Sequence, residues 1–210
     1  MRVPRARARA HARREAPRVQ ACGVASRRSI VRVVIAPRPD TGTVSLLSVG
    51  SLVPRKGHDV LIPALATLKD LPWRLRIAGD PTRDPATARE LEAEIARLGL
   101  QDRIVLLGAV SDAALAALYS EADAFVLASR FEGYGMAYAE AIAHGLPVIA
   151  TRTGAVPETV PQDAALFVAP DDADALADAL RDLIGDRALR ERLSQGARNA
   201  AADLATWRHS

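Results

Sequence analysis

Short apolar runs alternate with longer helix-forming stretches along the chain from residue 43 onward. The runs are four to six residues long, and most are bounded by glycine, proline or acidic residues, which is typical of buried strands. Strands that are separated by helices predict a parallel sheet with helical crossover connections. We expect six strands, at Val44–Val49, Trp73–Ala78, Ile104–Leu107, Ala124–Leu127, Pro147–Ala150 and Ala165–Val168.

The stretches between the strands show helical periodicity, such as the apolar stripe formed by Leu91, Ile95 and Leu98. The predicted fold is therefore α/β, a doubly wound Rossmann-like parallel sheet of about six strands. Pro81–Pro85 is expected to be a loop. The expected helices, with a brief turn at Val156–Val160, are His58–Lys69, Ala86–Leu98, Asp112–Ser120, Met136–Ala143, Ala173–Ile184 and Arg187–Leu204.

The strand ends predict where a ligand binds. In a doubly wound sheet, ligands bind outside the carboxyl ends of the strands, at the point where the strand order reverses. The loops that follow Val49, Ala78, Leu107 and Ala128 are therefore the expected site.

The N-terminal segment differs from the rest in composition. Residues 1–40 hold eleven arginines against Glu15 and Asp40, so the formal net charge of +3 is a property of this segment. Residues 1–18 have too few aliphatic side chains to fold alone, whereas Ser29–Ala36 could form one strand. We expect residues 1–42 to be an Arg-rich disordered extension and linker, followed by one domain at residues 43–206. A polyanion-binding arm and a targeting peptide are the alternatives for the extension.

Composition restricts the class of protein. The single cysteine, Cys22, excludes an internal disulfide framework and fits a reducing cytoplasm. No run of about 18 apolar residues occurs, so we expect no transmembrane helix. We therefore expect a cytoplasmic protein, with association at a membrane surface as the alternative, and we do not expect nucleic acid as its partner.

The stretch from Arg130 to Glu140 contains the strongest candidate chemistry. Glycines flank Tyr134 just after an expected strand, and helix formers begin at Met136. A Gly-rich turn before a helix N-terminus predicts a phosphate site, because free amide groups and the helix dipole favour an anion there. Glu132 and Glu140 would lie about 12 Å apart if helical, the length scale of a nucleoside diphosphate with a group at each end. Taken singly, each glutamate is better explained as a solvated charge.

A second charged cluster follows the first expected strand, in the loop from Gly50 to Gly57. Arg55 and Lys56 lie in this loop just before a helix, and the only other lysine is Lys69. The loop lacks the residue order of a Walker motif. A solvated loop charge is the alternative interpretation of Lys56.

Other chemistries find no support in the sequence. The four histidines are scattered, so no metal site is expected, and His58 is interpreted as an N-terminal helix residue. The acidic run at residues 171–174 is interpreted as a helix cap, by Asp171 or Asp172, rather than as a metal-binding Asp-x-Asp motif. No Gly-x-Ser-x-Gly nucleophile motif and no lysine motif typical of a pyridoxal phosphate site occurs, and no cofactor is expected.

Several motifs occur in one order along the chain. They are Gly50 with Pro54-Arg55-Lys56-Gly57, Gly79-Asp80, Gly108-x-Val110-Ser111-Asp112, Ser129-x-x-Glu132-Gly133-Tyr134-Gly135, Glu140 and Gly145-x-Pro147-Val148. Together they resemble the donor-binding half of a retaining family 4 glycosyltransferase with the GT-B fold. The resemblance covers about residues 43–206.

The resemblance implies roles for individual residues. Arg55 and Lys56 would hold the diphosphate of a UDP- or GDP-linked sugar, and Glu132 would contact the sugar hydroxyls, so these three are the expected catalytic residues. Glu140 would contact the ribose hydroxyls. The resemblance also implies transfer with retention and without a metal. The other expected donor-binding residues, at strand ends and on the Gly-rich turn, are Gly50, Gly79, Val110, Gly133, Tyr134, Gly135 and Met136.

Two features depart from the family pattern. Ser51 stands where many relatives have an arginine, and the Arg-rich residues 1–42 cannot supply the acceptor-binding domain of a GT-B enzyme. We therefore expect a glycosyltransferase half that needs an acceptor-domain partner. The alternatives are an inactive nucleotide-sugar-binding module or fragment, a domain tethered by its arginine arm, and a GT-B epimerase or phosphorylase, because fold does not fix function.

Overall fold

The computed structural model describes residues 42–206, and their side chains as far as residue 202. All of these residues belong to one structural unit. The expected Arg-rich extension and the expected strand at Ser29–Ala36 lie outside the described residues.

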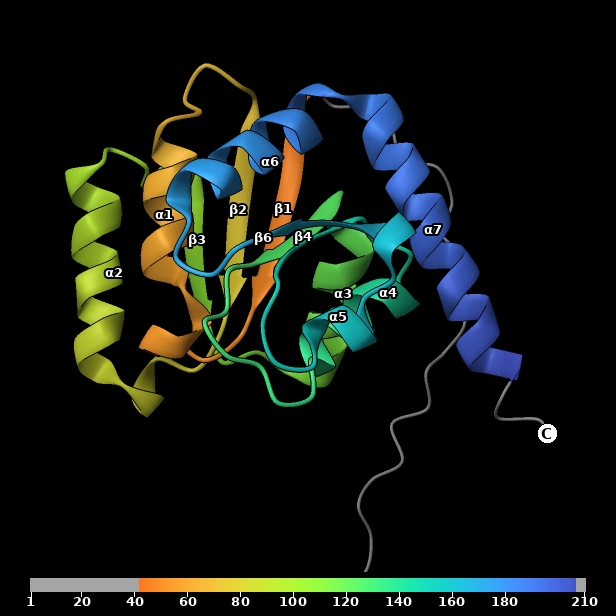
Figure 1. The fold of residues 1–210 in the computed structure, drawn as a ribbon. Helices are drawn as coiled ribbons and strands as arrows, with labels where there is room; N and C mark the ends of the chain where they lie inside the picture. The colour runs from red at the N-terminus through yellow and green to blue at the C-terminus, as the bar shows by residue number, and fades with distance from the viewer. Residues whose placement is uncertain (1–41, 207–210) are drawn as a thin grey trace, which may run out of the picture. The chain divides into compact units, whose positions relative to one another are not determined.

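A six-stranded, all-parallel sheet forms the centre of the fold (Figure 1), in the order β3-β2-β1-β4-β5-β6. The strand order reverses between β1 and β4, where Leu46 pairs with Ala124 and Leu47 with Phe125. This arrangement confirms the expected doubly wound Rossmann-like sheet. The strands are β1 (Val44–Val49), β2 (Trp73–Ala78), β3 (Ile104–Gly108), β4 (Ala124–Leu127), β5 (Val148–Thr151) and β6 (Ala165–Val168).

Helices cover both faces of the sheet. One face packs against α1 (His58–Ala66), α2 (Pro85–Arg97) and α6 (Ala173–Gly185). The other packs against α3 (Asp112–Glu121) and α4 (Met136–Ala143). The long α7 (Arg187–Thr206) contacts both α6 and α4. The short elements in the connecting loops are α5 (Val156–Thr159), η1 (Pro54–Lys56), η2 (Pro81–Arg83) and η3 (Gln162–Ala164).

The two faces divide the core into two apolar clusters. Leu46 and Leu47 are both fully buried, yet they belong to opposite clusters because successive strand residues point to opposite faces. Burying a side chain of this size stabilises the fold by about 1.5–3 kcal/mol. Tyr138 of α4 is also fully buried, and its hydroxyl donates a 2.7 Å hydrogen bond to the Leu127 carbonyl. This bond fixes the start of α4 to the end of β4.

Small boundary differences from the sequence prediction have local causes. The helix α1 ends at Ala66 rather than Lys69, where the Thr67 hydroxyl donates to the Ala64 carbonyl at 2.7 Å. The strand β5 begins one residue later than expected because Pro147 has no N–H for the ladder; its carbonyl still accepts from Phe125.

The second helix also differs from the prediction at its start. It begins at Pro85, a residue expected in the loop, because the Asp84 side chain caps it and proline suits the first helical position. The three residues of η2 form a short turn inside the same expected loop.

Candidate functional site

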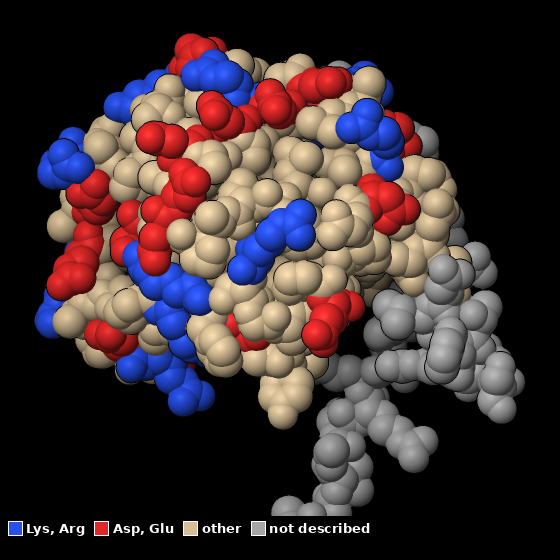
Figure 2. Space-filling model, in the orientation of Figure 1, with Lys and Arg blue, Asp and Glu red and all other residues tan. Residues whose placement is uncertain are grey.

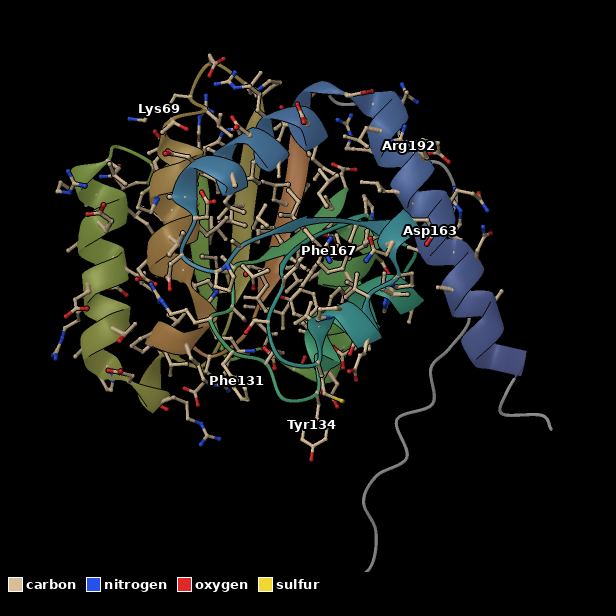
Figure 3. All side chains as sticks on the ribbon, in the orientation of Figure 1. Lys69, Phe131, Tyr134, Asp163, Phe167 and Arg192 are labelled. Carbon is tan, nitrogen blue, oxygen red and sulfur yellow. The ribbon has the colours of Figure 1, made fainter. Side chains whose placement is uncertain are left out.

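The loops that follow four neighbouring strands lie together at the carboxyl edge of the sheet. The Gly50 N–H donates to the Ala78 carbonyl at 2.9 Å, and the Gly79 N–H donates to the Gly108 carbonyl at 3.0 Å. In Figure 3, Phe131 and Tyr134 mark this edge, and Lys69 marks the opposite one. The structure thus brings together the loops in which sequence reasoning placed the site.

Two glycines allow these loops to pack backbone against backbone. A Cβ on Gly79 would lie 1.9 Å from the Gly50 carbonyl oxygen, and one on Gly57 would lie 1.9 Å from the Ala128 carbonyl oxygen. Gly57 also has a φ of +67°, a conformation that L side chains rarely adopt. Any side chain at these positions would push the loops apart.

Lys56 is buried in the loop after β1, and its stem passes directly over Gly50. A Cβ on Gly50 would lie 3.0 Å from the lysine Cε, so glycine makes room for the stem. The Lys56 Nζ lies 2.6 Å from Glu132 Oε2, and the Ser129 hydroxyl donates to the same oxygen at 3.3 Å. Only 9% of the lysine side chain and 12% of the glutamate side chain are exposed. Two of the three residues expected to be catalytic, Lys56 and Glu132, therefore form one nearly buried ion pair.

The loop after β5 holds the backbone of Glu132. The Ala155 N–H donates to the Glu132 carbonyl at 3.0 Å, and a Cβ on Gly154 would lie 2.1 Å from that carbonyl oxygen. Sequence reasoning did not assign Ser129, Gly154 or Ala155 to the site. Two features of the sequence could have indicated them: Ser129 lies three residues before Glu132, and Gly154 follows soon after a buried strand.

The Gly-rich turn forms the start of α4. Gly135 caps the helix with a φ of +63°, and a Cβ there would lie 3.0 Å from the Thr159 hydroxyl oxygen. The first amide groups of a helix lack intrahelical acceptors, so this end can bind an anion. Tyr134 is 86% exposed and Met136 is 62% exposed, whereas space is open around Gly133. The turn expected to bind phosphate therefore ends in a left-handed glycine, followed directly by the N-terminus of α4.

Glu140 lies half-buried in the second turn of α4, near Tyr119 of α3. Burial, and after it the charge of Glu140, raise the pKa of the Tyr119 hydroxyl well above its usual range. That hydroxyl also donates to the Ala137 carbonyl at 3.1 Å. Tyr119 was not predicted, because an aromatic residue on a short helix carries no signal that it faces a glutamate elsewhere in the chain.

The remaining expected residues line the same edge. Val110, in the loop after β3, packs half-buried against the cluster that contains Leu127. Asp80 accepts a 3.3 Å hydrogen bond at its carbonyl from Leu52 in the lysine loop. Arg55 is exposed, and its carbonyl accepts a hydrogen bond from the Arg130 N–H.

His58 lies directly beneath the lysine loop. It is 1% exposed, and its Nε2 lies 3.3 Å from the Ser48 hydroxyl oxygen. Burial, and after it the positive charge of Lys56, lower the pKa of His58 to about 4. A neutral histidine there adds no second positive charge next to Lys56 at neutral pH.

Charge is unevenly placed on the surface (Figure 2). Acidic side chains gather on the upper and left parts of the face shown, with basic side chains among them at the top, and basic side chains also reach its lower left edge. Within residues 42–206, no group of three or more His, Cys, Asp or Glu side chains is arranged to hold a metal ion. None of the helices in this part of the chain is long and apolar enough to cross a membrane.

Comparison with known proteins gives a family match. The family model described as glycosyl transferases group 1 matches residues 36–200. Mannosylfructose-phosphate synthase of Agrobacterium fabrum is 31% identical over 169 residues, which are 77% of this chain and 37% of that protein. A GDP-mannose-dependent phosphatidylinositol monomannoside mannosyltransferase of Mycobacterium tuberculosis is 32% identical over 175 residues, 78% of this chain and 44% of that protein.

A solved structure shows the same fold. Anabaena HepE in complex with UDP and glucose superposes with a TM-score of 0.71 at 26% identity, covering 77% of this chain and 44% of that one. The chain thus spans less than half the length of each of these three proteins.

Proposed function

Because the chain belongs to the group 1 glycosyl transferases, we propose that its described domain binds a nucleotide diphosphate sugar and serves as the donor side of a glycosyltransferase. The observation that carries the proposal is the Lys56–Glu132 ion pair, which lies at the carboxyl edge of the sheet at its switch point. Ligands of doubly wound sheets bind at this place.

The proposed donor lies along this edge. Lys56 and Arg55 contact its diphosphate from the loop after β1, while the amides of Gly135 and Met136 contact it from the start of α4. Glu132 accepts from the sugar hydroxyls, and Glu140 accepts from the ribose hydroxyls. Gly50, Gly79, Gly133 and Tyr134 border the donor, and Val110 contacts the base.

This placement supplies the charge stabilisation that glycosyl transfer requires. The bond from the sugar's anomeric carbon to the diphosphate oxygen breaks, and its electron pair leaves with the diphosphate. A new bond forms to an acceptor hydroxyl oxygen, which releases its proton. The buried Lys56, the exposed Arg55 and a helix N-terminus stabilise the growing negative charge on the diphosphate, as preorganised electrostatics do. We propose that the reaction retains the anomeric configuration and uses no metal.

The donor base is proposed to be uracil or guanine. One relative's name specifies GDP-mannose, and the HepE structure contains UDP. We propose an acceptor-binding polypeptide as the partner of this domain. Phe131, Tyr134 and Met136 support this partner, because they expose three large apolar side chains beside the site.

Turnover tests the proposal directly. The purified chain is incubated with UDP-glucose and with GDP-mannose, and the anomeric proton signals are followed by NMR, beside the Glu132→Gln variant. Water replaces the acceptor hydroxyl in this assay, so the expected result is hydrolysis of one donor, with release of the sugar in the α configuration, and its loss in Glu132→Gln. Saturable donor binding without any turnover would favour the second candidate, an inactive nucleotide-sugar-binding module. A chain that neither binds nor turns over a donor would contradict both functions.

A further inference from the structure

Arg130 contacts three segments around the site, although no role in the site has been assigned to it. Its side chain forms a two-pronged ion pair with Asp59 at the start of α1, with both N···O distances at 2.8 Å. Its Nε donates to Asp171 at 2.7 Å, and its Nη1 also donates to the Pro54 carbonyl. One guanidinium therefore joins the lysine loop, α1 and the loop before α6.

The backbone of Arg130 adds two further connections. Its N–H donates to the Arg55 carbonyl at 2.8 Å, and its own carbonyl accepts from the Thr153 hydroxyl at 2.8 Å. Lys56 lies between the segments that Arg130 contacts, and Glu132 follows Arg130 by two residues. The two loops that carry the Lys56–Glu132 pair are thus fastened to each other at a second place.

The guanidinium is occupied by protein acceptors. Arginine has five N–H donors, and the contacts to Asp59, Asp171 and Pro54 use four of them. Two carboxylates also outweigh its single positive charge locally, so little attraction remains for a phosphate. Arg55, in contrast, is exposed at the same edge. Arg55 can therefore contact a phosphate, whereas the guanidinium of Arg130 is held by protein acceptors.

Asp171 is held in an unusual backbone conformation. It is the only residue other than glycine among residues 42–206 with a positive φ, at +60°. Such a conformation is unfavourable for most side chains, although aspartate and asparagine tolerate it best, and it persists where the surroundings hold it. The 2.7 Å contact with Arg130 ties this residue to the loop after β4.

We propose that Arg130 is a positioning residue of the donor site, which keeps Lys56 and Glu132 in register through Asp59 and Asp171 and does not bind the donor itself. The expected effect of Arg130 on donor affinity rests on the proposed function. The fastening of the two loops by Arg130 does not, and it is measurable in the donor-free protein.

The variants Arg130→Gln, Asp59→Asn and Asp59→Glu separate positioning from direct phosphate binding. Removing the Asp59 charge frees the guanidinium, so direct binding predicts unchanged or tighter nucleotide affinity in Asp59→Asn. Positioning predicts that Asp59→Asn and Arg130→Gln each weaken binding by roughly tenfold, and that the double variant is no weaker than either single one. Asp59→Glu retains both carboxylate oxygens, so it should recover much of the loss.

Hydrogen exchange in the donor-free protein gives the independent readout. Amides of residues 53–57 and 130–135 should exchange about tenfold faster in Arg130→Gln, with unchanged exchange in β1 and β4. Arg181→Gln removes the remote surface pair with Asp70, whose N···O distance is 3.0 Å, and is the matched control. Unchanged loop exchange in Arg130→Gln, or tighter nucleotide binding in Asp59→Asn, would overturn the inference. If the parent chain binds neither UDP nor GDP, the proposed function fails, and loop exchange still decides the positioning role.

Discussion

Lys56 and Glu132 are 76 positions apart in the sequence, yet the lysine Nζ lies 2.6 Å from Glu132 Oε2 in a nearly buried contact. Each charge neutralises the other at the carboxyl edge of the sheet. The pair joins the loops that follow β1 and β4, the two strands at which the strand order reverses. The fold therefore holds together the lysine and the glutamate that we propose as the cation and the carboxylate of the donor site.

Breaking one side of this pair should destabilise the domain. Removing one partner of a buried pair leaves an unpaired charge, so Lys56→Met and Glu132→Gln should each reduce the free energy of unfolding by about 2–4 kcal/mol. The double variant should lose clearly less than the sum, because it leaves no unpaired charge. Urea denaturation of the four proteins measures this coupling, with Lys69→Met as the control. Additive losses would show that the two side chains do not interact in solution.

Stability should depend on pH through His58. The folded-state pKa is lowered from 6.5 to about 4, so the unfolded chain binds the proton more tightly in this window. The resulting stability is fully present above pH 6.5 and is lost as pH falls towards 4, by roughly 3 kcal/mol in total. Urea denaturation at several pH values should show a flatter dependence in His58→Gln than in the parent. Parallel curves for the two proteins would contradict the buried neutral histidine.

Alanine substitutions at three glycines distinguish the cost of backbone strain from the cost of steric clash. Gly57→Ala combines a positive φ with a Cβ 1.9 Å from the Ala128 carbonyl oxygen, and should destabilise by more than about 3 kcal/mol. Gly108→Ala has a φ of +68° in open space and should lose about 1 kcal/mol. Gly133→Ala has neither problem and should stay within about 0.5 kcal/mol of the parent. Thermal and urea denaturation rank the three variants, and equal losses at Gly57 and Gly108 would be inconsistent with the close loop packing.

The proposed role of Glu140 can be tested on the ligand as well as on the protein. If its carboxylate accepts from the ribose hydroxyls, Glu140→Gln should weaken binding of the ribonucleotide by roughly tenfold, because a hydrogen bond to a charged group is worth about 1.5–3 kcal/mol. The same substitution should leave binding of the 2′,3′-dideoxy nucleotide unchanged. Calorimetric titration of both proteins with both ligands gives the comparison. An equal loss for the two ligands would place Glu140 away from the ribose.

Much of the fold was predictable because local patterns specify it. Val44–Val49, Trp73–Ala78 and Ala124–Leu127 form strands with the expected bounds, and Met136–Ala143 forms the expected helix. Most of the apolar residues of these segments are buried by the fold, so the local sequence preference and the tertiary packing specify the same elements. The acidic run was correctly interpreted as a cap, which the Asp172 side chain provides by accepting from the Ala175 N–H.

The connections around the site were less predictable. Hydrophobic periodicity does not specify that β1 lies beside β4, and without that order nothing in the sequence brings Lys56 to Glu132. The Arg130 contacts with Asp59 and Asp171 join three polar residues that each resemble an ordinary loop or helix-end charge. Motif resemblance identified the lysine loop and the Gly-rich turn, but not the residues that hold them together.

The central claim is that this edge of the sheet binds a nucleotide diphosphate sugar, and calorimetric titration with UDP and GDP tests it most directly. The parent, Lys56→Ala and Lys69→Ala are compared, since Lys56 contacts Glu132, whereas Lys69 lies at the edge opposite to Phe131 and Tyr134 (Figure 3). The account predicts saturable binding of one of the two nucleotides. Lys56→Ala should weaken that binding at least about tenfold, or 1.4 kcal/mol, and Lys69→Ala should leave it unchanged. Binding of neither nucleotide, or equal weakening by the two substitutions, would contradict the account.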